Sequence, residues 1–408
     1  MLYQTILILN FLSLIICFII FEYRLIKFVQ DINYNTLLYR KFFKYFYIKN
    51  FYMFLTLLSL FIDNIIVLII NLVVFIYLIV KNIKYKNIIK LRFTKRLIIY
   101  LFINLFIILC FYMFIDIYII FLLIPFIGVL SIYISKVIDY LFNLKYFYKA
   151  KKKIDKINPY VISISGSSGK TSVKNIVYDL IKDDYVSYKT KKSFNTLKGI
   201  EITINDINDN IYKPYLILEM GAKKRNDIKS ICNLVKPDLS ILTNILPQHL
   251  ETFKSIDNVL EEKSNIIWSL KENGICIIND DDHELRKLKE RIKLNRKDVK
   301  IYSYSIIDKS SFIYAYNIDL SLNKTTFNVS FDNHTYFIES PLIGKHSVYN
   351  IMISLIVCFI LKINIEKIIL KLKYINYIPN RLEIKKRDNI LFLDDSYNSN
   401  INGFINAI

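Results

Sequence analysis

The chain has 408 residues, of which 54% are hydrophobic and 22% are charged, and its formal net charge is +20. The length predicts two or three domains. Most of the excess positive charge lies in residues 1–157, beside long apolar runs, so we interpret it as a membrane-orienting pattern and expect no nucleic-acid partner. The five cysteines are scattered without metal-binding spacing, which favours reduced, buried thiols.

Apolar segments dominate the start of the chain. Each of four segments is long enough to cross a bilayer: 2–21, 51–80, 97–115 and 117–134. The second segment is interrupted at Asp63, so it crosses either once or twice. We therefore predict an N-terminal block of four or five transmembrane helices over residues 1–134. Asp63 and Asp116 are either intramembrane carboxylates or turn residues at the interface, and we favour turns.

Basic loops lie between and after these segments, at 22–50, 81–96 and 135–156. The positive-inside rule places all three loops in the cytoplasm, which requires five spans. The resulting prediction is a multi-pass cell-membrane protein that contacts the lipid bilayer and carries a cytoplasmic catalytic domain. Residues 135–157 are predicted to be a basic amphipathic linker, which is either a helix on the inner leaflet or a plain helical connection.

The stretch VISISGSSGKTSVKN, residues 161–175, has the pattern of a strand, a Gly-rich turn and the start of a helix. Backbone N–H groups in such a turn, with a helix N-terminus behind them, form an anion cradle. We expect Lys170 to reach the β- and γ-phosphates of ATP and the Thr171 hydroxyl to bind Mg²⁺. The loop is a variant, because Ile164 stands where the standard pattern has a glycine. The predicted phosphate-binding residues are Gly166, Ser167, Ser168, Gly169, Lys170, Thr171 and Ser172.

Three further polar residues could complete a metal site. Glu219 ends a predicted buried strand, and a carboxylate at the carboxyl end of a parallel strand points into the ligand crevice. His249 follows a second strand, and Lys263 lies on a predicted helix. Each residue alone is more simply a capping acid, a surface histidine or a solvated lysine. Their ordered spacing after a phosphate loop favours a joint site, with Lys170, Glu219, His249 and Lys263 as the catalytic residues.

Together these stretches resemble the Mur ligases, which are ATP-dependent amide-bond ligases of peptidoglycan synthesis. The likeness is strongest to the subgroup that adds D-alanyl-D-alanine to UDP-N-acetylmuramoyl-tripeptide, in the form with an N-terminal membrane block. The matching stretches cover nearly all of residues 160–408 in family order: SGSSGKTSVKN, SFNTLKGI, LEMGAKKRNDI, TNILPQHLETF, EEKSNII, INDDDHE, LIGKHSVYN, PNRLEIK and LDDSYNSN.

The resemblance implies a role for each matching position. Lys170 and Thr171 would hold the triphosphate and one Mg²⁺ ion. Glu219 and His249 would bind metal. Lys263 matches a lysine that is carbamylated in the family, and as a carbamate it would orient a second Mg²⁺ ion. The positions that match nucleotide-contacting residues are Asn279, Asn350, Arg381 and Asp395.

The resemblance also implies the fold class. It is an α/β P-loop domain with a mostly parallel central sheet flanked by helices, over residues 158–376. A linker and the beginning of a C-terminal ligase domain follow over residues 377–408. The chain stops at Ile408, inside what resembles the first helix of that domain. We therefore expect a truncated chain from which the C-terminal domain is missing.

The implied activity is that of an ATP-dependent C–N ligase with ATP and Mg²⁺ as cofactors. The γ-phosphoryl group of ATP is transferred to a carboxylate, and an amine attacks the resulting acyl phosphate. The expected substrates are a UDP-linked muramoyl peptide and D-alanyl-D-alanine. Two alternatives stay open. One is a non-catalytic, ATP-binding membrane scaffold or truncated pseudoenzyme, and the other is a superfamily ligase of the folylpolyglutamate or cyanophycin synthetase type.

Overall fold

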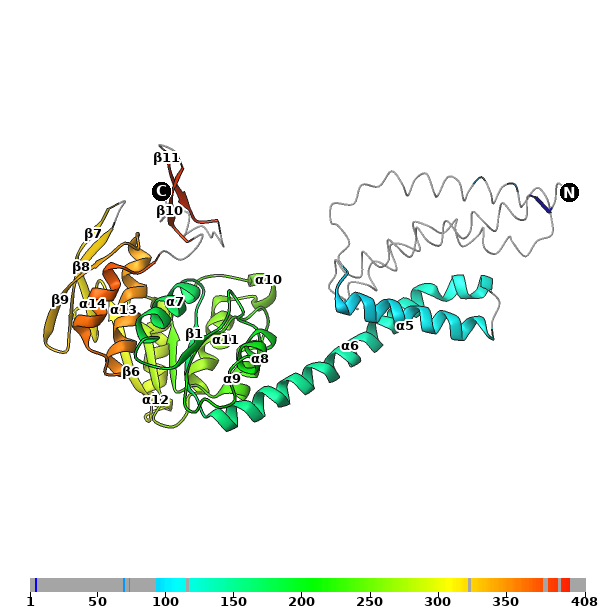
Figure 1. The fold of residues 1–408 in the computed structure, drawn as a ribbon, viewed down its shortest axis with the longest axis horizontal. Coiled ribbons are helices and arrows are strands. Elements are labelled where there is room, and N and C mark those ends of the chain that lie inside the picture. The colour runs from blue at the N-terminus through cyan, green and yellow to red at the C-terminus, as the bar shows by residue number, and fades with distance from the viewer. Residues whose placement is uncertain are drawn as a thin grey trace. The chain divides into compact units, whose positions relative to one another are not determined.

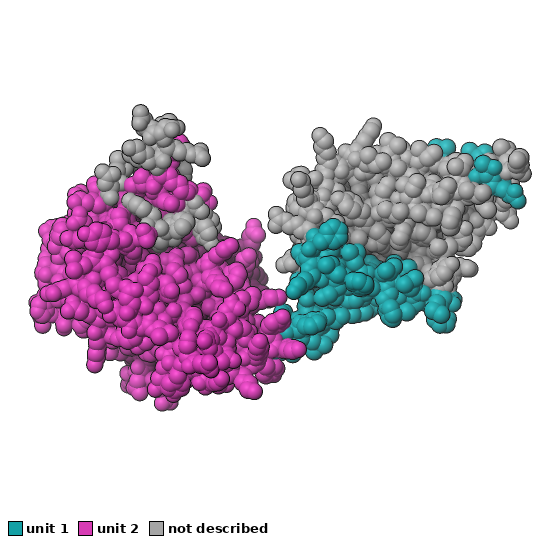
Figure 2. Space-filling model, in the orientation of Figure 1, with its two compact units in different colours: residues 1–144 teal, residues 145–408 magenta. Residues whose placement is uncertain are grey.

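The computed structural model describes residues 4–5, 69, 73, 93–114, 117–321, 324–376, 381–387 and 390–396. The chain divides into two compact units, residues 1–144 and residues 145–408 (Figure 2). Several predictions fall almost entirely outside the described residues: the apolar segments 2–21 and 51–80, the basic loops 22–50 and 81–96, and the acids Asp63 and Asp116.

Two long helices precede the sheet. Helix α5 (Lys95–Tyr112) begins after Thr94, whose hydroxyl accepts a hydrogen bond from the Leu97 N–H at 3.2 Å. Helix α6 (Ile117–Ile157) is continuous over 41 residues. It includes both the predicted last span and the predicted linker, so no break in the backbone separates these two segments.

The predicted multi-pass membrane location is contradicted. Among the described residues, which exclude nearly all of segments 2–21 and 51–80, a single helical stretch, Phe126–Ile157, is long and apolar enough to cross a membrane, whereas the prediction requires four or five. The last turns of α6 pack against the second unit, because Ala150, Ile154 and Ile157 are buried in its core. This side of the helix therefore packs on protein and not on an inner leaflet. A hydrophobic run indicates burial, but it does not identify the medium that buries it.

A nine-stranded sheet forms the centre of the second unit, in the order β2-β3-β1-β4-β5-β6-β7-β8-β9. Neighbours are parallel from β2 to β7, and β7, β8 and β9 form an antiparallel meander. The strands are β1 (Tyr160–Ser165), β2 (Ser187–Lys189), β3 (Tyr215–Glu219), β4 (Leu239–Leu242), β5 (Ile275–Asn279), β6 (Lys300–Ser305), β7 (Ile313–Leu320), β8 (Thr325–Phe331) and β9 (His334–Ser340).

Helices cover both faces of this sheet, since the parallel strands are apolar on both sides. In β1, Ile162 and Ile164 pack into one core cluster with α7, α13 and α14, while Val161 packs into the other with α8, α9, α11, α12 and the end of α6 (Figure 1). The predicted α/β domain with a mostly parallel, helix-flanked sheet is confirmed. The helices are α7 (Lys170–Ile181), α8 (Leu197–Asn205), α9 (Asp227–Val235), α10 (Leu250–Phe253), α11 (Ile256–Trp268), α12 (His283–Asn295), α13 (Lys345–Ile360) and α14 (Ile365–Lys373).

The strand order reverses at β1. The chain leaves β1 toward β2, returns through β3, and then places β4 on the other side of β1. Open α/β sheets bind their ligands at such a switch point, outside the carboxyl ends of the strands. After the large sheet, β10 (Glu383–Arg387) and β11 (Ile390–Asp394) form a separate antiparallel pair.

Candidate nucleotide-binding site

The turn after β1 depends on two glycines with positive φ. Gly166 has φ +141°, and a Cβ atom there would lie 2.0 Å from the Thr243 Oγ1 atom. Gly169 has φ +80° and directly precedes α7, and a Cβ atom there would lie 3.0 Å from the Asn350 Oδ1 atom. Both positions exclude a side chain, one by a severe clash and both by backbone conformation. The turn therefore closes tightly at the carboxyl end of β1.

Residues at the carboxyl end of β4 hold the turn in place. The Asn244 carbonyl oxygen accepts a hydrogen bond from the Ser167 N–H at 2.9 Å, and the Asn244 Oδ1 atom accepts one from the Ser168 N–H at 2.8 Å. The Thr243 hydroxyl donates to the Ser168 carbonyl oxygen at 2.5 Å. These bonds satisfy the first half of the turn from a strand about 75 residues away along the chain.

The second half of the turn remains open to an anion. Within the part of the chain that the structure describes, the backbone N–H groups of Gly169, Lys170, Thr171 and Ser172 have no hydrogen-bond acceptor. They form the N-terminal turn of α7, where the helix dipole favours negative charge. This is the geometry of a phosphate site.

Two lysines, Lys263 buried and Lys170 partly buried, converge on one carbonyl oxygen. The Lys170 Nζ atom lies 2.8 Å and the Lys263 Nζ atom 2.7 Å from the Gly166 oxygen. Burial lowers the pKa of Lys170, while the charge of Glu219 opposes that shift. Burial, and then repulsion from Lys170, lower the pKa of Lys263 to about 7. The site therefore contains a lysine whose neutral amine is abundant near neutral pH.

Glu219 lies at the end of β3 and is almost fully buried. Its Oε2 atom accepts hydrogen bonds from the Thr171 hydroxyl at 2.9 Å and from the Lys174 ammonium group at 3.0 Å. Its Oε1 atom accepts one from the Asn195 amide at 3.3 Å. Lys174 also donates to the Lys192 carbonyl oxygen, so it joins α7 to the loop that carries Asn195. The structure thus brings Thr171 and Glu219 into direct contact.

His249 is not part of this group. It precedes the short helix α10 with φ +54°, and its side chain is exposed. Among the described residues its imidazole has no hydrogen bond or ion pair, and no set of three His, Cys, Asp or Glu side chains gathers as a metal centre. The metal-binding role predicted for His249 therefore stays a prediction.

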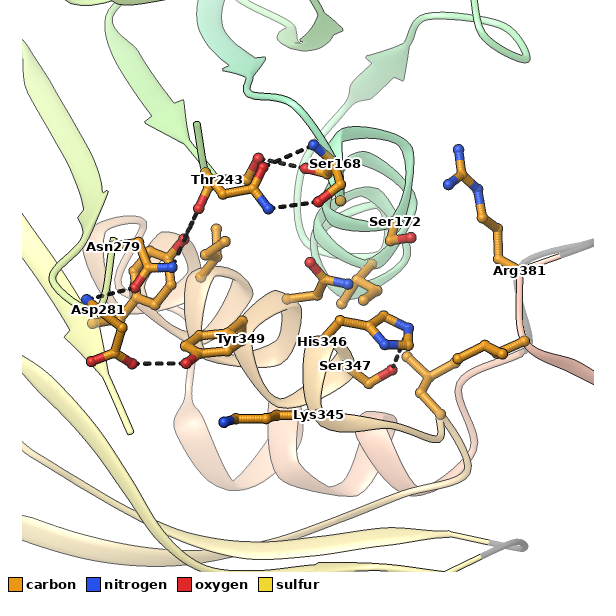
Figure 3. A pocket seen from close by; sticks show the side chains of 18 of the residues that line it. Ser168, Ser172, Thr243, Asn279, Asp281, Lys345, His346, Ser347, Tyr349 and Arg381 are labelled. Atoms are coloured by element: carbon orange, nitrogen blue, oxygen red, sulfur yellow. Dashed lines mark hydrogen bonds between the residues drawn. The ribbon is translucent and has the colours of Figure 1, made fainter. Parts of the chain in front are cut away.

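A cavity of about 330 Å³ begins at the phosphate turn and extends along α13. Figure 3 shows Ser168, Ser172 and Thr243 at its phosphate end, while Arg381 enters from a separate segment of backbone. The residues predicted to contact the nucleotide line this one cavity: Asn279, Asn350, Arg381 and Asp395. Positions far apart in the sequence are thus brought to the same crevice.

Hydrogen bonds fix the wall of the cavity that is opposite to α7. The Asn279 amide and the Tyr304 hydroxyl both donate to the Thr243 carbonyl oxygen, at 3.4 and 3.0 Å. The Tyr349 hydroxyl donates to Asp281 at 2.8 Å, and the Ile306 N–H donates to the same carboxylate oxygen at 2.9 Å (Figure 3). This wall is held rigid by contacts between β4, β5, β6 and α13.

The N-terminal turn of α13 supplies a second polar wall. Lys345, His346 and Ser347 line the cavity there. Burial lowers the pKa of His346, and the nearby Arg381 charge acts in the same direction while Asp395 opposes it. The imidazole is therefore expected to be neutral at pH 7, which suits a hydrogen-bonding role beside a ligand.

Sequence reasoning missed several of these residues. Thr243 and Asn244 follow a buried strand directly, so the criterion that identified Glu219 could have found them too. Lys174 lies four residues after Lys170 on the same helix, and this spacing carries no information about its partner Glu219. Asp281 occurs in a run of three acids, and only the tertiary structure distinguishes the one that contacts Tyr349.

Comparison with known proteins gives consistent results. Residues 164–358 match the family model described as the Mur ligase middle domain. The UDP-N-acetylmuramoyl-tripeptide–D-alanyl-D-alanine ligase of Buchnera aphidicola subsp. Baizongia pistaciae is 32% identical over 255 residues, which are 62% of this chain and 54% of that protein. The Escherichia coli ligase of the same name is 27% identical over 249 residues, 61% and 54% of the two chains. The chain thus spans about half the length of the curated relatives it matches.

Solved structures agree with this result. A crystal structure of MurF from Acinetobacter baumannii has a TM-score of 0.59 at 22% identity, and the match covers 64% of this chain and 56% of that one. MurF ligase from Thermotoga maritima, solved in complex with ADP, has a TM-score of 0.58 at 26% identity and covers 64% and 59%. The resemblance to the Mur ligases is confirmed.

Proposed function

Because residues 164–358 match the model of the Mur ligase middle domain, we propose that this chain acts as an ATP-dependent C–N ligase of peptidoglycan synthesis. The names of its relatives suggest the substrates, UDP-N-acetylmuramoyl-tripeptide and D-alanyl-D-alanine. One observation carries the proposal. The phosphate turn and the four side chains expected at the nucleotide, which come from distant parts of the sequence, line a single cavity.

ATP would bind with its phosphates at the open N–H groups of α7. Lys170 would leave the Gly166 carbonyl oxygen and turn to the β- and γ-phosphates, which are stronger acceptors. The adenosine part would extend along α13, between Asn279 and Asn350. Arg381 and Asp395 would close the other side of the cavity, with the guanidinium group near phosphate and the carboxylate near a ribose hydroxyl.

Thr171 and Glu219 fit a Mg²⁺ ion. Mg²⁺ prefers hard oxygen ligands and usually combines one or two protein groups with water and phosphate oxygens. The Thr171 hydroxyl and the Glu219 carboxylate supply two such oxygens 2.9 Å apart at the phosphate turn. The bound ion would neutralise charge on the transferring phosphoryl group. Lys174 would hold Glu219 in place through its bond to the Oε2 atom.

Lys263 is suited to become a carbamate. Only a neutral amine adds to CO₂, and the pKa of Lys263 is lowered to about 7 by burial and by Lys170. The modification would replace a cation beside Lys170 with an anion. Repulsion between the Lys170 and Lys263 amines would then become attraction between an ammonium group and a carbamate. The proposed role of the carbamate is to help orient the metal and phosphate groups.

The reaction would need no protein nucleophile. A substrate carboxylate oxygen would attack the γ-phosphorus atom, and the bond to the leaving ADP oxygen would break, giving an acyl phosphate. The amine of the second substrate would then attack the acyl carbon, lose a proton and expel phosphate. Lys170 and the α7 N–H groups would stabilise charge on the phosphoryl oxygens during the first step.

The first step can be tested separately from the second. ATP labelled with ¹⁸O in the β–γ bridge would be incubated with the full chain, Mg²⁺ and UDP-N-acetylmuramoyl-tripeptide, without the dipeptide. Reversible phosphoryl transfer would move the label into the non-bridging β-positions. We expect this scrambling to require the tripeptide and to be absent with the unacylated UDP-sugar. Addition of D-alanyl-D-alanine should then release phosphate.

Two results would count against the proposal. ATP binding without scrambling under any substrate would favour the non-catalytic scaffold. Scrambling with a folate or an amino-acid polymer, but not with the muramoyl tripeptide, would indicate another ligase of the superfamily.

A further inference from the structure

One hydroxyl beside the phosphate turn has no hydrogen-bond partner. Ser165 is the last residue of β1 and has no exposed surface, and its Oγ atom is unpaired. Leaving a buried hydroxyl without a partner is unfavourable, so native structures seldom do so unless a ligand or another group completes the bond. Among the described residues the other buried, unpaired hydroxyls are those of Ser131, Ser187 and Thr325, none of which adjoins the turn.

The direction of this hydroxyl follows from its strand. Side chains alternate along β1, so Ser165 points to the same face as Ser163. The Ser163 hydroxyl lies 2.8 Å from that of Ser240, which donates to the Ile266 carbonyl oxygen in α11. Ser165 therefore faces α11 as well, one pair of residues closer to the turn. The α11 residue that reaches the turn is Lys263, at 2.7 Å from the oxygen of the next residue, Gly166.

We propose that Ser165 is a positioning residue that donates a hydrogen bond to a carbamate formed on Lys263. The inference rests on the proposed function only through the modification of Lys263. The proposal names Ser165 as the hydrogen-bond donor to the carbamate. It also explains why the Ser165 hydroxyl is buried without a partner at the edge of the site.

The chemistry of the modification requires such a donor. The lone pair of the Lys263 amine attacks the carbon of CO₂, a new N–C bond forms, and one N–H proton leaves to water. The remaining N–H can keep its bond to the Gly166 oxygen. The two new carboxylate oxygens are acceptors in a buried place, and a buried anion is stable only when donors or cations pair with it. Ser165 supplies a hydroxyl donor and Lys170 a cation.

The test uses the full chain equilibrated with ¹³C-bicarbonate, and ¹³C NMR detects the carbamate carbon directly without an activity assay. Five proteins are compared: wild type, Lys263→Met, Ser165→Ala, Ser165→Thr and Ser163→Ala. The last variant is the matched control, because it removes a buried hydroxyl from the same face of the same strand, one pair of residues away. Circular dichroism and melting curves establish that each variant is folded.

We expect a carbamate signal in the wild type that Lys263→Met abolishes. In Ser165→Ala the CO₂ concentration for half-maximal signal should rise about tenfold, because a hydrogen bond to a charged group is lost. Ser165→Thr, which keeps the hydroxyl, and Ser163→Ala should resemble the wild type. An equal rise in Ser163→Ala and Ser165→Ala, or no rise in Ser165→Ala, would overturn the proposal.

The experiments distinguish failure of the Ser165 assignment from failure of the proposed ligase activity. No carbamate signal in the wild type would overturn the assignment to Ser165, whatever the isotope-scrambling experiment shows. Scrambling that fails while the carbamate signal still depends on Ser165 would count against the ligase activity alone.

Discussion

The two halves of the nine-stranded sheet contribute to the site very differently. In the parallel half, β1, β3, β4 and β5 each end at a residue of the site or directly before one: the phosphate turn, Glu219, Thr243 and Asn279. In the antiparallel half, β7, β8 and β9 contribute no residue to the cavity. Parallel strands place all their carboxyl ends at one edge, so polar residues that follow them converge. In a meander successive ends alternate between opposite edges, and this convergence is lost.

The meander supports the site from a distance. Phe327 and Val329 on β8 are fully buried and pack in the core cluster that contains α13. The first turn of α13 provides Lys345, His346 and Ser347 to the cavity. The parallel half of the sheet therefore supplies the residues of the site, and the antiparallel half stabilises the helix that carries part of it. Changes in the parallel half should act on nucleotide chemistry, and changes in the meander should act on stability or not at all.

The largest effect is expected from Lys170→Ala in the parallel half. Removing the ammonium group at the phosphates should lower the rate of phosphate release, at saturating ATP, by about 10³-fold. The matched control is Lys182→Ala, an exposed lysine just after the same helix that pairs with Asp179 at 3.1 Å and lies over the Tyr178 ring. A loss of less than tenfold in Lys170→Ala would show that this lysine does not act on the phosphates.

Lys174→Met tests whether the Lys174 ammonium group stabilises the buried Glu219 carboxylate. The variant leaves a buried carboxylate without its cation, so the free energy of unfolding should fall by about 3–5 kcal/mol. Urea denaturation measures this change. The double variant with Glu219→Gln should lose much less, because the charge that needs compensation is also gone. Equal losses in the single and double variants would mean that the pair does not act as a unit.

Lys263→Met should have an effect on stability that depends on pH. The pKa of Lys263 is about 7 in the folded chain and near 10.5 when exposed, so between these values the unfolded state binds more protons and stability rises with pH. Below pH 7 the buried Lys263 is charged in the folded chain, so the full free-energy cost of burying that charge is present. The variant should therefore be more stable than the wild type by a few kcal/mol at pH 6, and this advantage should shrink toward pH 10. Melting curves of both proteins are measured in CO₂-free buffer from pH 6 to pH 10. A difference in stability that stays constant over this range would contradict the prediction.

The smallest effect is expected in the meander. Lys324 on the loop before β8 pairs with Glu339 at 2.8 Å, and both side chains are partly exposed. Lys324→Ala should leave the melting temperature and the rate of phosphate release unchanged within error, because exposed ion pairs contribute little. A clear change in the rate would show that the meander takes part in the chemistry.

Local sequence patterns predicted the phosphate turn and the acid that ends β3, because each depends on residues that are neighbours in the chain, whereas the class of sheet came from the resemblance to a family. Sequence reasoning placed Asn279, Asn350, Arg381 and Asp395 only through the resemblance to a family. It could not find the Thr243–Ser168 bond or the Lys174–Glu219 pair, which join residues 75 and 45 positions apart. The multi-pass location is contradicted, whereas the N-terminal block of transmembrane helices stays a prediction, because segments 2–21 and 51–80 lie almost entirely outside the described residues.

The position of Arg381 and Asp395 has a thermodynamic consequence. Both belong to the segment after α14, outside the large sheet, and both line the cavity. A ligand that touches them couples its own binding to the docking of that segment. Such coupling is reciprocal, so anything else that holds the segment down must tighten the ligand by the same factor. The affinity for nucleotide would then change whenever the docking of the segment after α14 is strengthened or weakened, even by a group that does not touch the nucleotide.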